Sequence, residues 1–176
     1  MDKLCFYSGS ADVCAGRGVH EYVKDVSNYR ELNKIKHWRK ILSNFYVSPF
    51  LYENKEWNTV EHAFQSKKIA LQSMEKADWF HKHSGHAIGQ GDGFIARKNR
   101  KIMILSPENL ERWDFMKKDI LEKILLAKFS QDKLCKKTLI STLDAELWHS
   151  VHSDPVRQFE LENVRTYFKN QRWIFS

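Results

Sequence analysis

The spacing of apolar residues along the chain predicts a fold built mainly from helices. Within residues 59–71, Val60, Phe64 and Leu71 fall on one side of a helix with 3.6 residues per turn. A longer apolar stripe predicts a helix over residues 107–129, which a capping serine precedes and a proline begins. Further helices are predicted at residues 74–83, 94–105 and 134–143, and a last one from Asp154-Pro155 onward.

Short extended segments complete the predicted fold. Residues 4–8, 45–47 and 50–57 have the composition of strands, and the last of them contains a turn at residues 53–55. Glycine and proline are scarce, at seven and three of 176 residues, which is typical of a helix-rich chain. We therefore expect a mainly α, multihelical single domain over residues 1–176, with a few short strands near its N-terminus.

Composition and charge narrow the class of partner. A net charge of +7 favours anionic partners such as phosphates, nucleotides or nucleic acid, without choosing among them. The three cysteines are widely spaced, which predicts neither a disulfide framework nor a zinc site. No apolar run approaches the roughly 18 residues of a membrane span, and the first residues lack a signal-peptide pattern. We expect an intracellular, cytoplasmic protein that contacts no membrane.

Histidines are the remaining candidates for metal ligands. His81, His83 and His86 are spaced as H-x-H-x-x-H, but they straddle the predicted end of a helix and a glycine-rich loop. Ligands must converge on the ion, so we interpret these histidines as surface residues. We expect neither a metal nor another cofactor.

The helix over residues 59–71 carries the chemistry that the sequence offers most clearly. Glu61, Gln65 and Lys68 lie at positions i, i+4 and i+7, so an acid, an amide and an amine share one face beside the apolar stripe. Ionisable groups beside a packed wall have shifted pKa values, which acid–base and amine chemistry requires. The alternative is structural: Asn58 is the N-cap, and Glu61 closes a capping box from the third helical position.

A glycine-rich loop leads into the basic helix predicted at residues 94–105. Arg97, Arg100 and Lys101 share one face of that helix, which suits either phosphate binding or simple solvation. Trp113 lies at helical spacing in the next predicted helix, where it is either a core residue or a surface on which a nucleobase stacks.

Three motifs in the first half of the chain resemble those of the NADAR (YbiA-like) superfamily, which is named for a link to NAD and ADP-ribose. They are Ser43-Asn44-Phe45, Ser48-Pro49-Phe50, and Thr59-Val60-Glu61-His62-Ala63-Phe64-Gln65 followed by Lys68. Weaker similarity continues through Trp113, Met116 and residues 127–131 and 139–147, so the resemblance covers most of the chain. An added N-terminal stretch, and a final segment without the glycines of bacterial members, make the chain more like a divergent branch found in eukaryotes and large viruses.

The resemblance implies a mostly helical fold and N-glycosidase chemistry. Two substrate classes are associated with such proteins, namely ADP-ribose attached to guanine, free or in nucleic acid, and ribosylamine intermediates of riboflavin synthesis. Both contain an N-glycosidic bond at C1 of a phosphorylated ribose. Carried over to this sequence, the resemblance makes Glu61 the candidate carboxylate beside C1 and Lys68 the candidate nucleophile. The expected substrate contacts are Asn44, Gln65, Arg97, Arg100 and Trp113.

Two other classes of function remain alternatives at this point. A non-catalytic ADP-ribose-binding module needs the same pocket, but it tolerates replacement of Glu61 and Lys68. A basic nucleic-acid-binding protein accounts equally well for the positive charge, although none of the common nucleic-acid-binding motifs is present in the sequence.

Overall fold

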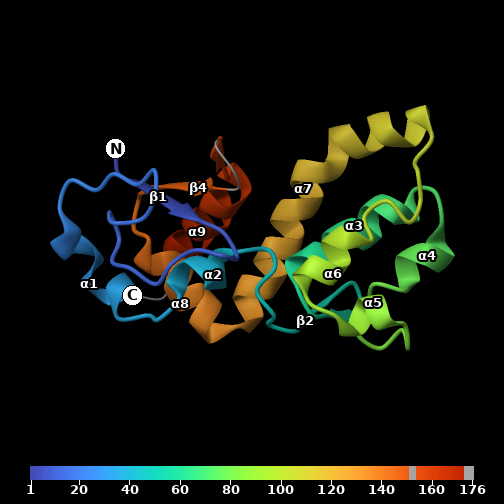
Figure 1. Cartoon of the computed structure of the whole chain (residues 1–176), viewed down its shortest axis with the longest axis horizontal. Coiled ribbons are helices and arrows are strands. Elements are labelled where there is room, and N and C mark those ends of the chain that lie inside the picture. Colours follow the sequence, from blue (N-terminus) through green and yellow to red (C-terminus); the bar gives the residue numbers. More distant parts are fainter. Residues whose placement is uncertain (151–153, 173–176) are drawn as a thin grey trace. The chain divides into compact units, whose positions relative to one another are not determined.

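A computed structural model describes residues 1–150 and 154–172 (Figure 1). The chain divides into two compact units, one formed by residues 1–43 and 133–176 and the other by residues 44–132. Among the helices of the described ranges, none has the length and apolar character needed to cross a bilayer. The prediction of one domain over residues 1–176 stays a prediction.

The first unit, residues 1–43 and 133–176, contains a small sheet with helices around it. Its elements are β1 (Lys3–Phe6), the 3-10 helix η1 (Val26–Tyr29), α1 (Arg30–Asn33), α2 (Trp38–Leu42), α8 (Lys133–Ser141), β4 (Glu146–His149), β5 (Val156–Arg157) and α9 (Phe159–Arg172). The strand order is β1-β4-β5, with β1 parallel and β5 antiparallel to β4. Leu4 lies opposite Leu147 in the register, and both are fully buried.

The final helix begins later than the sequence predicts. Residues 156 and 157 pair with β4 as an edge strand, so α9 begins at Phe159 rather than directly after Pro155. This shift changes which face of the helix is buried. The residues buried in α9 are Leu161, Val164, Arg165 and Phe168, whereas Val156, Phe159 and Tyr167, which the sequence pattern also suggests for the interior, are exposed.

A buried ion pair organises the N-terminal loop of the first unit. Arg39 forms a bidentate pair with Glu21, with contacts of 2.9 Å from Nε and 2.7 Å from Nη2. The Glu21 carboxylate also accepts hydrogen bonds from the backbone N–H groups of Gly16 and Gly18 at 2.9 Å. Each buried charge thus has a partner, which is the condition for burying charge without a large free-energy cost.

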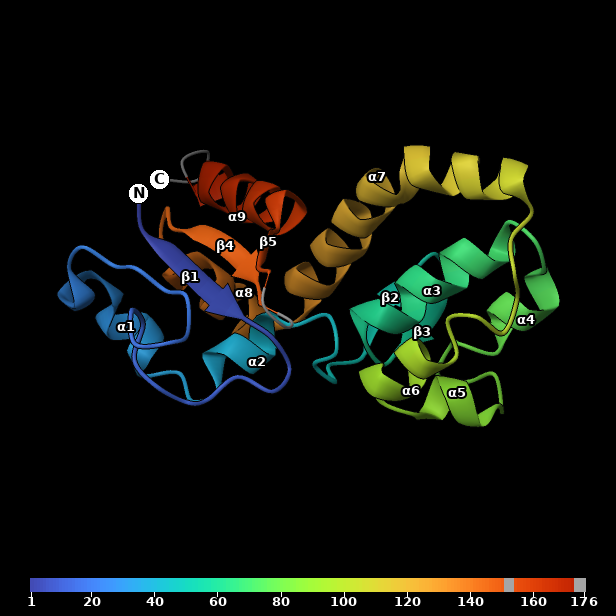
Figure 2. The same ribbon diagram turned by 45° about the horizontal axis from the view of Figure 1, so that its top comes forward.

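The second unit, residues 44–132, contains the helix with the candidate chemistry. Its elements are β2 (Phe50–Tyr52), β3 (Lys55–Trp57), α3 (Val60–Ala70), α4 (Met74–Asp78), α5 (Ala87–Gln90), α6 (Gly93–Lys98) and α7 (Pro107–Gln131). The strands β2 and β3 form the predicted hairpin, in which Glu53 and Asn54 take positive φ angles at the turn. The helix α3 packs against α4, α6 and α7 (Figure 2).

The C-terminal end of α7 fixes the segment that precedes α3. The amide of Gln131 bonds both the N–H and the carbonyl of Leu51, at 2.8 and 2.7 Å. The amine of Lys128 donates to the carbonyl of Tyr46 at 3.1 Å. These contacts hold residues 45–47 in an irregular conformation, so the strand predicted there is not formed.

Two helices of this unit are shorter than predicted. The helix predicted to His83 ends at Asp78, and the backbone N–H of Lys82 donates instead to the carbonyl of Glu56 at 2.8 Å. The basic helix ends at Lys98, where the backbone N–H and the side-chain amide of the capping residue Asn99 both donate to the Ile95 carbonyl, at 3.2 and 2.9 Å.

Candidate functional site

The start of α3 places Glu61 one position earlier in the helix than a capping box requires. The Thr59 hydroxyl accepts a hydrogen bond from the N–H of His62 at 3.3 Å, so Thr59 is the N-cap and Glu61 is the second helical residue. The backbone N–H of Glu61 donates to the carbonyl of Asn44 at 3.1 Å. The capping-box alternative with Asn58 as the cap is therefore wrong, and the Glu61 carboxylate is not used to cap the helix.

Asn58 and His62 tie the glycine-rich loop to the start of α3. The Asn58 amide donates to the carbonyls of Gly89 and Gly91 at 3.0 and 3.1 Å. The His62 Nε2 lies 2.9 Å from the Ile88 carbonyl, which can only accept, so this nitrogen donates and Nδ1 accepts from the capping threonine hydroxyl at 2.8 Å. Burial lowers the pKa of His62, which keeps the ring neutral in this arrangement.

A close approach at Gly93 brings α6 against the segment that precedes α3. A Cβ atom at Gly93 would lie 2.5 Å from the Cα atom of Phe45, a distance that side-chain carbons do not tolerate. Only glycine permits this contact. Because Gly93 is the first residue of α6, the contact fixes the helix that carries Arg97 beside the start of α3.

The Glu61 carboxylate is buried in a polar environment. Glu61 is 5% exposed, accepts a hydrogen bond from Gln65 Nε2 at 2.8 Å, and lies 3.6 Å from Arg97 Nη1. Burial raises the pKa of Glu61, while Gln65, Arg97 and Arg100 oppose that rise. The side-chain oxygen of Gln65, Oε1, is also buried, and it has no hydrogen-bond partner among the described residues. The site thus offers a carboxylate favoured in its protonated form and an unused acceptor beside it.

Lys68 lies on the same face of α3, two turns from Glu61. Burial lowers the pKa of Lys68, and Arg97 and Arg100 lower it further, while Asp114 and Glu61 act in the opposite direction. Within residues 1–150 and 154–172, no carboxylate lies within ion-pair distance of the Lys68 amine. A half-buried amine with a lowered pKa has the properties of a nucleophile or a proton acceptor.

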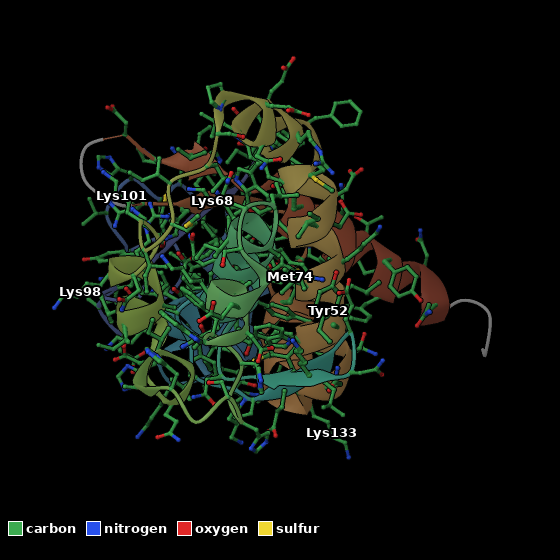
Figure 3. All side chains as sticks on the ribbon, turned by 90° about the vertical axis from the view of Figure 1, so that its right-hand side faces the viewer. Tyr52, Lys68, Met74, Lys98, Lys101 and Lys133 are labelled. Atoms are coloured by element: carbon green, nitrogen blue, oxygen red, sulfur yellow. The ribbon has the colours of Figure 1, made fainter. Side chains whose placement is uncertain are left out.

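The neighbouring lysine belongs to a different environment. The Lys67 amine forms an ion pair with Glu53 and lies 5.5 Å from the centre of the Tyr52 ring. In Figure 3, Lys68 and Lys101 lie on one side of α3, and Tyr52 on the other. The two adjacent lysines therefore face different sides of the helix, and only Lys68 shares the face of Glu61.

The structure brings most of the sequence-predicted residues together. Arg97 contacts Glu61 directly, and Arg100 affects the pKa values of both Glu61 and Lys68. Asn44 holds the backbone of Glu61 through its carbonyl, and its own side chain is half-buried. A carboxylate, an amide, an amine and two guanidinium groups thus gather at one end of the second unit.

Trp113 is the exception. Its side chain is 4% exposed, and its ring packs against Phe64 at 4.8 Å between ring centres. A ring that is this deeply buried cannot stack on a nucleobase without rearrangement, so the structure places Trp113 in the core. The physical reason is that α7 lies directly against α3, and the two aromatic side chains fill the space between them.

The described ranges provide no group of three or more His, Cys, Asp and Glu side chains able to hold a metal. His83 lies 2.6 Å from Glu56, and the His86 ring stacks on Trp79 with ring centres 4.6 Å apart. These two histidines are therefore engaged with other side chains rather than with each other.

Sequence reasoning missed three residues of the site. Asn58 and His62 position the glycine-rich loop. In the sequence, however, Asn58 suggests a helix cap, and His62 lies beside Glu61, which is the stronger candidate for catalysis. Phe94, at the start of α6, contacts Phe45 and is 59% exposed. The sequence signal that could have identified it is an aromatic residue three positions before Arg97 in the predicted basic helix.

Comparisons with known proteins identify the family and the fold. The model of the family described as the NADAR domain matches residues 32–173. A similar solved structure is the NMR structure of the E. coli protein YbiA, with a TM-score of 0.59 and 16% identity over 98% of this chain and 89% of that one. At that identity the likeness shows the fold alone, and it confirms the predicted mainly α, YbiA-like class. No curated protein matches the chain.

Proposed function

The chain belongs to the NADAR domain family, and from this premise and the Glu61 site we propose that it hydrolyses the C1–N bond of a phosphorylated ribose. The preferred substrate in this proposal is ADP-ribose attached to guanine, in a nucleoside or in nucleic acid. The observation that carries the proposal is the buried carboxylate of Glu61 on one helix face with the half-buried amine of Lys68. Their pKa values are shifted in opposite directions, each toward the neutral form.

The proposed role of Glu61 follows from the charge that develops in the reaction. Cleavage of a C1–N bond builds positive charge on the ribose, which a carboxylate beside C1 stabilises. A raised pKa also favours the protonated carboxyl group, which can give its proton to the departing base. Gln65 orients the carboxyl group through its amide nitrogen and keeps its buried oxygen for a ribose hydroxyl.

Lys68 is proposed as the nucleophile. Its neutral amine attacks C1, the C1–N bond to the base breaks, and the base leaves with a proton from Glu61. The sugar ring then opens to give a Schiff base between C1 and the amine, and one water molecule hydrolyses it to the free sugar and lysine. The absence of a carboxylate within ion-pair distance of Lys68 in the described ranges supports this role, because pairing with Glu61 would raise the lysine pKa.

The arginines and Asn44 complete the proposed substrate site. Arg97 is 52% exposed, so its guanidinium can contact a ligand while it remains near Glu61. Arginine binds phosphate oxygens in a bidentate manner, and Arg97 with Arg100 suits the pyrophosphate of ADP-ribose. The side chain of Asn44, on the segment that bonds the backbone of Glu61, is assigned to the ribose or the base.

Product analysis tests this proposal directly. The protein is incubated with ADP-ribosylated guanosine, an ADP-ribosylated oligonucleotide, a ribosylamine 5-phosphate and free NAD, and the products are separated. We expect release of ADP-ribose and an unmodified base from the first two substrates. Turnover of the ribosylamine alone would favour the riboflavin-pathway class instead, and binding without turnover would identify a non-catalytic ADP-ribose-binding module.

Borohydride trapping distinguishes the two lysines. Reduction during turnover is expected to leave a stable adduct on Lys68, which peptide mapping locates. Lys67→Arg is the matched control, because Lys67 faces a different side of the helix in an ion pair with Glu53. If active protein forms no adduct and Lys68→Arg keeps most of the activity, the amine acts only through its charge, and Glu61 activates water directly.

A further inference from the structure

Phe94 is a large aromatic side chain that remains exposed on the surface of the second unit. It stands on the first turn of α6 and is 59% exposed. Its one ring partner is Phe45 among the described residues, with ring centres 4.9 Å apart and an angle of 81° between the planes. This edge-to-face contact fixes the orientation of the Phe94 ring and leaves more than half of the side chain accessible.

The position of Phe94 connects it to the Glu61 site. Phe94 precedes Arg97 by three residues, so the two side chains lie on neighbouring positions of one helix face. Phe45 follows Asn44, whose carbonyl holds the N–H of Glu61. The aromatic pair therefore borders the same surface as the carboxylate and the guanidinium groups.

We propose that Phe94, supported by Phe45, is the surface on which a purine ring of the substrate stacks. The inference rests on the proposed function. It assigns to Phe94 the stacking role that the sequence suggests for Trp113, whose side chain is buried in the core. Bases stack on aromatic side chains through the flat faces of both rings, and this contact accepts any purine. The neighbouring Arg97 and Arg100 provide the cations that the phosphates of a nucleotide require. An exposed aromatic ring beside two arginines thus matches a base linked to a ribose phosphate.

The substrate offers two purines, because ADP-ribosyl guanine contains adenine at one end and guanine at the other. Three probes separate them. ADP-ribose contains adenine alone, guanosine contains guanine alone, and ribose 5-phosphate contains no base. None of the three probes contains the bond between ADP-ribose and guanine that the proposed reaction cleaves, so calorimetric affinities report stacking independently of that reaction.

Phe94→Ala is compared with Phe94→Trp and with the control Phe115→Ala, which removes an equally large side chain that is 92% exposed on α7. For Phe94→Ala we expect affinity for ADP-ribose or guanosine to fall by about 5- to 150-fold, the usual range for one stacked base. Affinity for ribose 5-phosphate should not change. Phe94→Trp should keep the wild-type affinity for the purine ligand, and Phe115→Ala should match the wild type throughout.

Two results would overturn the inference while the proposed function stands. In one, Phe94→Ala binds every probe as the wild type does. In the other, it loses ribose 5-phosphate to the same extent as ADP-ribose, which indicates a general disturbance of the site. A wild-type protein that binds none of the probes and hydrolyses no substrate refutes the inference and the proposed function together.

Discussion

Replacement of Glu61 by glutamine is expected to stabilise the protein at neutral pH while it sharply lowers the proposed N-glycosidase activity. Burial raises the pKa of Glu61 above its ordinary value of 4.5, so the folded state holds the proton more tightly than the unfolded chain. The ionised carboxylate therefore costs folding free energy at every pH above the folded pKa. That cost decreases as the pH falls toward 4.5 and is absent below it, where both states are protonated.

The size of the effect follows from the contacts that glutamine keeps and loses. A glutamine oxygen can still accept the hydrogen bond from Gln65 Nε2, now 2.8 Å long. The contact with Arg97 is lost, but at 3.6 Å from a half-exposed guanidinium it is worth only about 0–1 kcal/mol. We expect a net gain of roughly 0.5–2 kcal/mol at pH 7, or about 1–8 °C in Tm. The rate should fall about a hundredfold or more, as for the loss of a positioned acid.

Thermal unfolding at pH 7 and pH 4, with hydrolysis rates measured on the same samples, tests this prediction. The gain in Tm should be present at pH 7 and absent at pH 4. Glu111→Gln, on the exposed side of α7, is the matched control and should change neither stability nor rate. If Glu61→Gln melts earlier than the wild type at pH 7 and keeps its rate per folded molecule, the carboxylate is structural and the reasoning is refuted.

Three further predictions concern the groups around Glu61. Removal of either charge, Arg97→Ala or Arg100→Ala, should weaken ADP-ribose binding by about 1.5–3 kcal/mol, and unchanged calorimetric affinity in both variants would contradict the pyrophosphate site. If Lys68 acts as the neutral amine and Glu61 as the protonated acid, the rate should show a bell-shaped dependence on pH, and Arg97→Gln should move both limbs to higher pH because Arg97 lowers the pKa of both groups. Gly93→Ala should cost about 1–3 kcal/mol of stability and reduce activity, because its Cβ would lie 2.5 Å from the Cα of Phe45; wild-type melting and activity would show that the close approach is dispensable.

Local signals in the sequence identified much of the second unit correctly. A serine before proline at the start of α7 and a turn at Glu53 and Asn54 each depend on neighbouring residues alone, and each predicted element is present. The helix α3 also begins near Thr59 as predicted, although its cap is Thr59 rather than Asn58. The shared face of Glu61 and Lys68 also follows from helical periodicity, because the spacing of residues on a helix is the same in any protein.

The features that the sequence did not reveal depend on partners distant along the chain. The end of α4 is set by the carbonyl of Glu56, which no helix propensity records. The burial of Trp113 depends on the approach of α7 to α3, and the start of α9 depends on the pairing of residues 156–157 with β4. Such contacts are absent from a periodicity argument, which treats each element in isolation.

The opposite pKa shifts of Glu61 and Lys68 have a common cause, and substrate binding should strengthen it. Burial is the largest influence on both groups, raising the pKa of the carboxyl and lowering the pKa of the amine. A substrate that covers the site excludes more water, and therefore favours the neutral form of each group further. Arg97 lowers the pKa of both groups, so a pyrophosphate that offsets its charge would favour the protonated carboxyl of Glu61 but also the charged amine of Lys68. The exclusion of water by the substrate must outweigh this second effect to give the protonated acid and the neutral amine that the proposed reaction requires.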